Sequence, residues 1–288
     1  MIAHVAEATE NSGRVVLQIA AHCELAPIAL AAALRVAHSF NASLESLVTE
    51  DPGIIDFARF DFAREVTTQG VIVAGITVSG LEELLQSRAV RLHGEVALAA
   101  RTAGVPVHCR TLREEPVGAI AAACFENGPW NVAVLAQAVS AQTEAHVRQL
   151  FDAIQDVTGI VVAGRDASRI AGAVVAIVEQ LAHVQPMLRA AEYLAGIAGS
   201  DVHLILFAGN TDETAWMEGQ VRLVLGEDTA PDLLLAPEIF ASPAALARIL
   251  QDLNAGFVIA RMGGTLLPPD GGLADFAQSH AGPLFLVR

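Results

Sequence analysis

The order of strand-like and helix-like segments recurs within this chain, and this repeat constrains the fold more than any other feature. Residues 15–47, VVLQIAAHCELAPIALAAALRVAHSFNASLESL, have the pattern of a strand, an alanine-rich helix and a second strand. Residues 174–207, VVAIVEQLAHVQPMLRAAEYLAGIAGSDVHLILF, have the same pattern. Strand and helix patterns continue to alternate after each passage, which is typical of a parallel sheet covered by helices. The sequence therefore predicts two copies of one β-α-β module, with a boundary near Gly164–Ile170.

Apolar runs and helical spacing place the elements of each half. In the first half, strands are expected at Arg14–Ala20, Ala42–Thr49, Val105–Leu112, Asn131–Ala136 and Thr158–Gly164, with helices at Leu25–Ser39, Leu81–Ala103, Pro116–Gly128 and Thr143–Asp156. In the second half, strands are expected at Ala171–Glu179, Asp201–Gly209, Asp232–Phe240, Phe257–Met262 and Pro283–Arg288, with helices at Pro186–Ala198, Thr214–Leu225, Pro243–Gly256 and Leu273–His280. Ser242 is expected to cap the helix that Pro243 begins. Gly104, Gly199 and Gly256 are each expected to end a helix just before a strand.

Composition excludes several classes of function. Apolar residues make up 53% of the chain and charged residues 17%, which indicates a globular protein with a large core. The net charge is −15, and all 17 basic residues are Arg, so the sequence lacks the footprint of a nucleic-acid-binding protein. The absence of lysine also excludes a Walker-type phosphate lysine and Schiff-base chemistry.

The N-terminus and the cysteines indicate the compartment. The first residues, MIAHVAEATENSG, lack a signal-peptide pattern, and no uncharged apolar run is long enough for a membrane span, so we expect a cytoplasmic protein. Cys23, Cys109 and Cys124 have no CxxC spacing, and the histidines and carboxylates show no metal-ligand or catalytic spacing. Cys109 and Cys124 are expected to pack in the core. Cys23 is expected to be a small thiol packed at a strand end. A second hypothesis makes Cys23, beside His22 at a helix N-terminus, a thiol of lowered pKa.

Beyond the repeated passages, the long helix is followed by VPVHCRTLREEPVGAIAAAC, and the chain ends in AGPLFLVR. In this order of elements the chain resembles the universal stress protein family, in its tandem two-domain form. The resemblance implies two doubly wound α/β domains of Rossmann-like type, at residues 1–166 and 167–288, each with a five-stranded parallel sheet flanked by helices. This implied fold is the one that universal stress proteins share with the adenine nucleotide alpha hydrolase-like proteins. The resemblance also implies an internal pseudo-dimer in which the last strands, Thr158–Gly164 and Pro283–Arg288, pair.

The resemblance also indicates where a nucleotide would bind. In ATP-binding members an Asp ends the first strand, and a Gly-x2-Gly-x9-Gly-Ser/Thr loop after the fourth strand wraps the phosphates, because glycine lets backbone N–H groups approach them. In the first half the Asp position is Ala20, and the loop LAQAVSAQTEAH contains no glycine. We therefore expect that half to have lost the site.

The second half retains part of the pattern. Glu179 stands at the Asp position, and the loop ARMGGTLLPPDGGLADF contains Gly263, Gly264, Gly271 and Gly272 at shorter spacing, with Arg261 where the first glycine would be. These six residues are the candidate nucleotide-binding set. The other interpretation is that the glycines serve turns in a loop that also contains Pro268 and Pro269, that Arg261 is a solvated charge, and that Glu179 opposes an anion.

The segment Asp51–Gly80 gathers Ile54, Ile55, Phe57, Phe60 and Phe62 in a chain with only 5% aromatic residues. Either it packs on its own domain, or it covers a sheet edge or a partner surface.

Three hypotheses follow. The first is a non-enzymatic stress-response or regulatory protein with a degenerate nucleotide motif and no cofactor, catalytic residue or metal. The second is an ATP- or AMP-binding regulator or slow ATPase that uses only the second half. The third is an assembly protein that uses the aromatic segment. A homodimer and an unidentified protein partner are both left open, and neither nucleic acid nor a membrane is expected as a partner.

Overall fold

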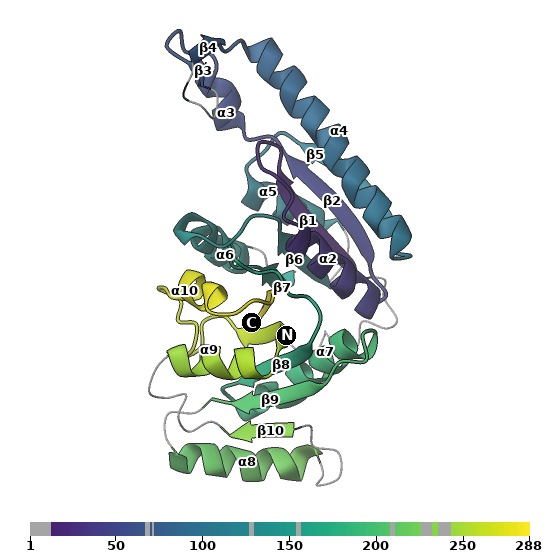
Figure 1. Cartoon of the computed structure of the whole chain (residues 1–288), viewed down its shortest axis with the longest axis vertical. Helices are drawn as coiled ribbons and strands as arrows, with labels where there is room; N and C mark the ends of the chain where they lie inside the picture. The colour runs from purple at the N-terminus through teal and green to yellow at the C-terminus, as the bar shows by residue number, and fades with distance from the viewer. Residues whose placement is uncertain are drawn as a thin grey trace.

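The computed structural model describes residues 13–66, 70, 72–126, 130–153, 157–207, 211–225, 232–235 and 243–288. Ten strands in this part of the chain form one sheet, in the order β10-β9-β8-β11-β12-β7-β6-β1-β2-β5 (Figure 1). The strands are β1 (Arg14–Ala20), β2 (Ser43–Thr49), β5 (Val107–Leu112), β6 (Asn131–Leu135), β7 (Val157–Val162), β8 (Ala173–Val178), β9 (Val202–Leu206), β10 (Asp232–Leu235), β11 (Ala255–Arg261) and β12 (Leu284–Val287). Neighbouring strands are parallel within each half of the sheet. The predicted α/β fold is confirmed.

Helices cover both faces of this sheet, which explains why the strands are so apolar. The helices are α2 (Pro27–Ser39), α4 (Val78–Thr102), α5 (Pro116–Phe125), α6 (Ala141–Ala153), α7 (Val184–Gly196), α8 (Thr211–Leu225), α9 (Pro243–Asp252) and α10 (Leu273–Gln278), with a 3-10 turn η1 (Leu181–His183) before α7. One core contains buried residues of α2, α4, α7 and α8, and a second core contains those of α5, α6, α9 and α10. Val15 and Leu17 of β1 belong to the first core and Val16 to the second, so successive side chains of one strand are buried on opposite faces.

Local sequence explains where the helices begin. Pro27 occupies the first turn of α2, where its missing N–H costs no hydrogen bond. Alanines at helical spacing then lie against the sheet, so the helix approaches it closely. The Thr77 hydroxyl accepts a hydrogen bond from the Gly80 N–H at 3.2 Å. This cap begins α4 at Val78, three residues before the predicted start at Leu81.

Two of the three glycines expected to end helices do so, and the third does not. Gly104 and Gly199 adopt left-handed backbone angles, with φ of 69° and 58°. In contrast, α9 ends at Asp252, and Gly256 lies inside β11, so its predicted role was wrong. Asn254 takes the left-handed position instead, with φ of 51°. Gly256 lets β11 approach the backbone of Ala171 closely, because a Cβ there would lie 2.6 Å from the carbonyl group of Ala171. The predicted cap Ser242 and helix end Gly128 lie outside the described residues.

The two halves of the sheet meet at β7 and β12, which pair in antiparallel orientation from Leu284 opposite Val162 to Val287 opposite Gly159. These are the strands whose pairing the resemblance implies. A Cβ on Gly159 would lie 2.2 Å from the Phe285 ring, so glycine allows the large side chain of the partner strand to cross here.

An excursion leaves the sheet between β2 and α4. It comprises α3 (Pro52–Phe57), β3 (Arg64–Val66) and β4 (Ile72–Gly75), and the two short strands form a separate antiparallel sheet (Figure 1). This segment is the aromatic-rich stretch that the sequence singled out.

Candidate functional site

The candidate residues of the second half meet at the point of the sheet where the direction of strand addition changes. From β8 the chain continues to β9 on one side, whereas the later strand β11 pairs with β8 on the other side. In parallel sheets, ligands bind outside the carboxyl ends of the strands at such a point. Glu179 directly follows β8, and Arg261 ends β11. The structure therefore brings Glu179, Arg261 and the loop after Arg261 together, as the sequence predicted.

The carboxylate of Glu179 occupies the backbone amides of that loop. The Thr265 N–H donates to one carboxylate oxygen at 2.7 Å, and the Leu266 N–H donates to the other at 2.8 Å. Two adjacent N–H groups that point at one anion form the kind of concavity that binds phosphate oxygens. Here the anion is a side chain of the protein itself.

Gly263 and Gly264 contribute to this arrangement in different ways. A Cβ on Gly264 would lie 2.0 Å from a carboxylate oxygen of Glu179, so this glycine leaves the space that the carboxylate fills. Gly263 has φ of 79° and turns the chain, and its N–H donates to the Leu267 carbonyl at 2.8 Å. One glycine admits the carboxylate, and the other shapes the turn.

The second pair of glycines precedes a helix whose first amides also bind a carboxylate. Gly272 has φ of 92° and stands at the N-cap of α10. The next two N–H groups, of Leu273 and Ala274, donate to the Glu144 carboxylate at 3.4 and 3.2 Å. Glu144 lies on α6 of the first half and is buried. Gly271 takes part in a turn, in which its N–H donates to the Pro268 carbonyl at 3.4 Å.

Arg261 supplies positive charge to the same site. Its Nε atom is buried and has no hydrogen-bond acceptor among the described residues. His183, at the end of η1, lies near both charged side chains. Burial lowers the pKa of His183 and the charge of Arg261 lowers it further, whereas the charge of Glu179 opposes the change. The site therefore contains a carboxylate, a guanidinium and a neutral imidazole, but the amides that would hold a phosphate are already bound.

The equivalent position in the first half contains an apolar cavity of about 480 Å³. Its lining includes Ala26, Pro27 and Ile28 at the start of α2, and Ala136 and Ala163 after β6 and β7. The loop after β6 folds back, with the Val139 N–H donating to the Ala163 carbonyl at 2.9 Å. No glycine lies in that loop, so its amides cannot approach a phosphate as the motif requires.

The structure bears on the expectations for all three cysteines. Burial raises the pKa of Cys23, with a hydrogen bond from Gln137 and the charge of Arg88 opposing the change, so the hypothesis of a lowered pKa was wrong. Cys109 is exposed, because β5 is an edge strand of the sheet, and its assignment to the core was also wrong. Cys124 is buried on α5, as predicted.

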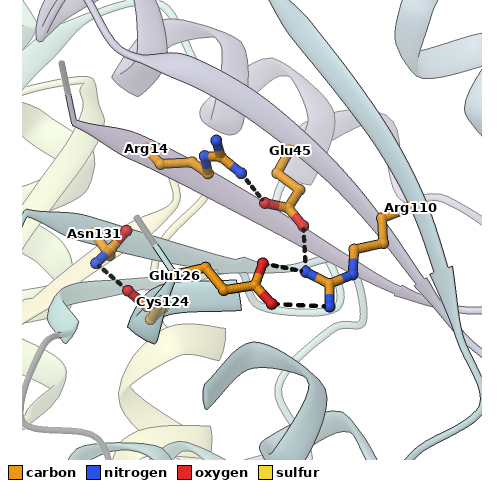
Figure 2. Close-up of polar contacts among 6 residues, drawn as sticks. All are labelled: Arg14, Glu45, Arg110, Cys124, Glu126 and Asn131. Atoms are coloured by element: carbon orange, nitrogen blue, oxygen red, sulfur yellow. Dashed lines mark hydrogen bonds and ion pairs between the residues drawn. The ribbon is translucent and has the colours of Figure 1, made fainter. Parts of the chain in front are cut away.

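Sequence reasoning missed an ion-pair network across three neighbouring strands. Figure 2 shows Glu45 of β2, which is buried, between Arg14 of β1 and Arg110 of β5. The Glu45 carboxylate lies 2.5 Å from Arg14 and 4.0 Å from Arg110, and Arg110 also binds Glu126 at 2.7 Å. Nearby, the Asn131 side chain donates to the Cys124 carbonyl at 3.1 Å. A charged residue in the middle of an apolar strand, Glu45, was the signal that could have revealed the network.

A second missed cluster lies between α4 and the sheet. The ring nitrogens of His93 hydrogen-bond to the hydroxyls of Ser46 on β2 and Thr111 on β5, at 2.9 and 3.0 Å. Burial lowers the pKa of His93. His93, Thr111, Glu50, Glu82 and Arg113 line a cavity of about 500 Å³, in which Arg113 is paired with both glutamates. Ser46 is fully buried, so the cluster anchors α4 to the strands.

Comparison with known proteins finds similarity in structure only. No protein-family model and no curated protein matches the sequence. The crystal structure of a universal stress protein from Archaeoglobus fulgidus DSM 4304 has a TM-score of 0.59 and 14% identity, over 98% of each chain. A putative universal stress protein from Pseudomonas aeruginosa UCBPP-PA14 has a TM-score of 0.56 and 14% identity, over 98% of this chain and 94% of that one. A protein of unknown function from Pseudomonas aeruginosa PAO1 has a TM-score of 0.57 and 15% identity, with the same coverage.

None of the helices in the described ranges has the length and hydropathy needed to cross a membrane. The structure superimposes on these two universal stress proteins over 98% of the chain. This chain therefore has the fold of the universal stress proteins.

Proposed function

We propose that this chain is a non-enzymatic stress-response or regulatory protein whose nucleotide motif has become a structural element. The observation that carries the proposal is the Glu179 carboxylate on the amides of Thr265 and Leu266. A nucleotide phosphate would need the same N–H groups, and it would meet the negative charge of Glu179 at the same place.

A second carboxylate supports the same conclusion. The α10 N-terminus, which would provide further donors to a phosphate, already binds Glu144. Like Glu179, Glu144 is held by two N–H groups, and it comes from the other half of the chain. Both sets of amides that could hold the phosphates of ATP are thus bound to carboxylates of the chain itself.

The test is thermal unfolding with and without ATP, ADP and AMP at millimolar concentration. A ligand that binds only the folded state at about one hundred times its Kd stabilises it by about 2.7 kcal/mol, which at about 2–4 °C per kcal/mol is a shift of about 5–11 °C. We expect no shift with any of the three nucleotides. A clear shift with the full chain would contradict the proposal.

One observation favours the alternative, an ATP- or AMP-binding regulator that uses only the second half. The buried Nε of Arg261 lacks an acceptor among the described residues and lies in the same site. This function would require the Glu179 carboxylate to leave the loop when the nucleotide arrives. Under the alternative, Glu179→Gln should strengthen nucleotide binding because it removes the competing charge, and Arg261→Gln should abolish it. If neither the unchanged chain nor Glu179→Gln binds nucleotide, the alternative fails.

A further inference from the structure

The apolar cavity of about 480 Å³ in the first half lies between three segments that are distant in the sequence. The start of α2 forms one side, the residues after β6 form a second side, and residues 163–170, which lead from β7 into the second half, form the third. Six of the lining residues are alanines, whose short side chains leave the space unfilled. The volume falls within the range of about 300–1,000 Å³ that is typical of small-molecule sites.

Backbone hydrogen bonds hold the walls of this cavity in place. The Val139 N–H donates to the Ala163 carbonyl at 2.9 Å and ties the loop after β6 to the segment after β7. The Ser168 and Arg169 N–H groups both donate to the Ala281 carbonyl of the second half, at 2.9 and 3.0 Å. The cavity is therefore preformed, as ligand sites usually are, and the second half fixes one of its walls.

The lining carries a single charged side chain among the described residues, and its charge is positive. Arg165 lines the cavity, is exposed, and forms no hydrogen bond or ion pair with any other described residue. Glu24 and Asp166 are exposed and do not belong to the lining. Because the whole chain carries −15, a cavity whose charged lining residue is a cation runs against the overall charge of the protein.

The chemistry of the lining selects the class of ligand. Alanine walls favour an apolar body, and the planar guanidinium of Arg165 matches the two oxygens of a carboxylate. The Gln137 amide already donates to the Cys23 thiol at 2.8 Å. In the second half the corresponding strand end supplies its own carboxylate, Glu179, whereas Ala20 stands at this position in the first half.

We propose that the cavity of the first half binds a small apolar carboxylic acid in its anionic form. The apolar body lies against the alanines, and the carboxylate lies at Arg165. Because the ligand also contacts the wall that the second half fixes, its binding stabilises the arrangement of the two halves. This site is separate from the Glu179 loop, so the inference does not rest on the proposed function.

The experiment is isothermal titration calorimetry of the full chain with octanoate, octan-1-ol and octylammonium, which share one alkyl chain and differ in the head group. Octanoate should bind at least about tenfold more tightly than octan-1-ol, because a hydrogen bond to a charged group contributes more than one between neutral groups. Octylammonium should bind most weakly, since its charge repels Arg165 and meets no carboxylate in the lining.

Two variants separate the head group from the body. Arg165→Gln should remove the advantage of octanoate and leave the affinity for octan-1-ol unchanged, whereas the control Arg169→Gln, in the same segment but outside the lining, should change neither. Ala31→Leu fills the cavity from α2 and should weaken both ligands by at least about tenfold. Its control is Ala99→Leu, which changes a partly exposed alanine of α4 outside the lining. Circular dichroism verifies that all four variants are folded.

Three results would overturn the proposal. The first is that octanoate does not bind, or that Ala31→Leu leaves its binding unchanged. The second is that octan-1-ol binds as tightly as octanoate, or that Arg165→Gln weakens both equally. The third is that ATP displaces octanoate, which would assign the cavity to a nucleotide. The Glu179 and Arg261 variants do not alter this lining, so failure here is distinguishable from failure of the proposed function.

Discussion

The guanidinium of Arg35 on α2 binds the carbonyl oxygen of Leu194 on α7, and thereby joins the two halves of the chain. The Nε and Nη2 atoms donate to this oxygen at 3.0 and 2.8 Å, and Nη1 donates to the Ile170 carbonyl. Leu194 lies in the last turn of α7, whose carbonyls lack partners within the helix. The guanidinium also lies 5.6 Å from the centre of the Phe257 ring. One half-buried cation thus caps a helix of the other half.

Arg35→Ala should lower the free energy of unfolding by about 3 kcal/mol, because hydrogen bonds to a charged group are worth about 1.5–3 kcal/mol and the carbonyls lose their partner. Arg35→Lys should recover only part of this loss, since an ammonium group cannot reproduce the planar fork. Urea unfolding measures both variants. The control is Arg91→Ala on the exposed face of α4, whose Glu95 pair should be worth about 0.5 kcal/mol or less. If Arg35→Ala and Arg91→Ala cost the same, Arg35 does not join the halves.

Glu179→Ala should convert the loop after β11 into an open anion site. The variant loses two charge-assisted hydrogen bonds, which should lower the free energy of unfolding by about 2 kcal/mol in a buffer without phosphate. Inorganic phosphate should then raise the melting temperature of the variant and leave that of the unchanged chain unaffected, because only the variant has free amides. Equal responses to phosphate, measured by thermal unfolding at constant ionic strength, would show that Glu179 does not fill an anion site.

Gly264→Ala should act through Glu179. The new methyl group would need the space of the carboxylate, which lies at the end of a flexible side chain and can move away, so the main cost is the loss of its two hydrogen bonds. The effects of Gly264→Ala and Glu179→Ala on unfolding should therefore not add in the double variant. The control is Gly263→Ala, which has open space around it and a φ of 79°, so it costs about 1 kcal/mol of backbone strain whether or not Glu179 is present. Additive effects for Gly264→Ala would mean that this glycine serves some other contact.

Much of the fold could be predicted from the sequence because the strands are buried on both faces. The largely apolar segment at residues 14–20 predicts a strand, and β1 has the predicted bounds. Prediction was weaker where a capping side chain sets the start of a helix, or where the place of a strand in the sheet sets the exposure of its side chains. The Thr77 cap moved the start of α4, and the position of β5 at the sheet edge exposes Cys109. Alternation along a strand does not reveal whether that strand lies at an edge.

The members of the candidate site could be predicted from the sequence, but their roles could not. Glu179, Arg261 and the glycines were found from the positions that the nucleotide motif occupies. Whether Glu179 contacts a ligand or replaces one depends on the conformation of a loop 86 residues away in sequence. The capping of α10 by Glu144 joins residues about 130 positions apart in different halves, and no local pattern encodes such a contact.

His280 should make the protein less stable in mild acid. Its ring is buried against Phe276, Nδ1 hydrogen-bonds to the Phe276 carbonyl at 3.0 Å, and burial lowers the pKa of His280 from 6.5 to about 4. Between these two values the unfolded chain binds a proton that the folded chain does not, so the free energy of unfolding falls as the pH falls. The full contribution is about 3 kcal/mol, present above pH 6.5 and lost near pH 4.

The measurement is urea unfolding between pH 7.5 and pH 4 for the unchanged chain and for His280→Gln, which keeps a hydrogen-bond donor but does not titrate. Other groups, including the carboxylates and the half-buried His93 and His183, titrate in both proteins, so the difference between the two curves isolates His280. That difference should shrink as the pH falls from 6.5 to 4, because the cost of keeping His280 neutral disappears in the variant. Parallel curves for the unchanged chain and His280→Gln would mean that the folded protein protonates His280 as readily as the unfolded chain does.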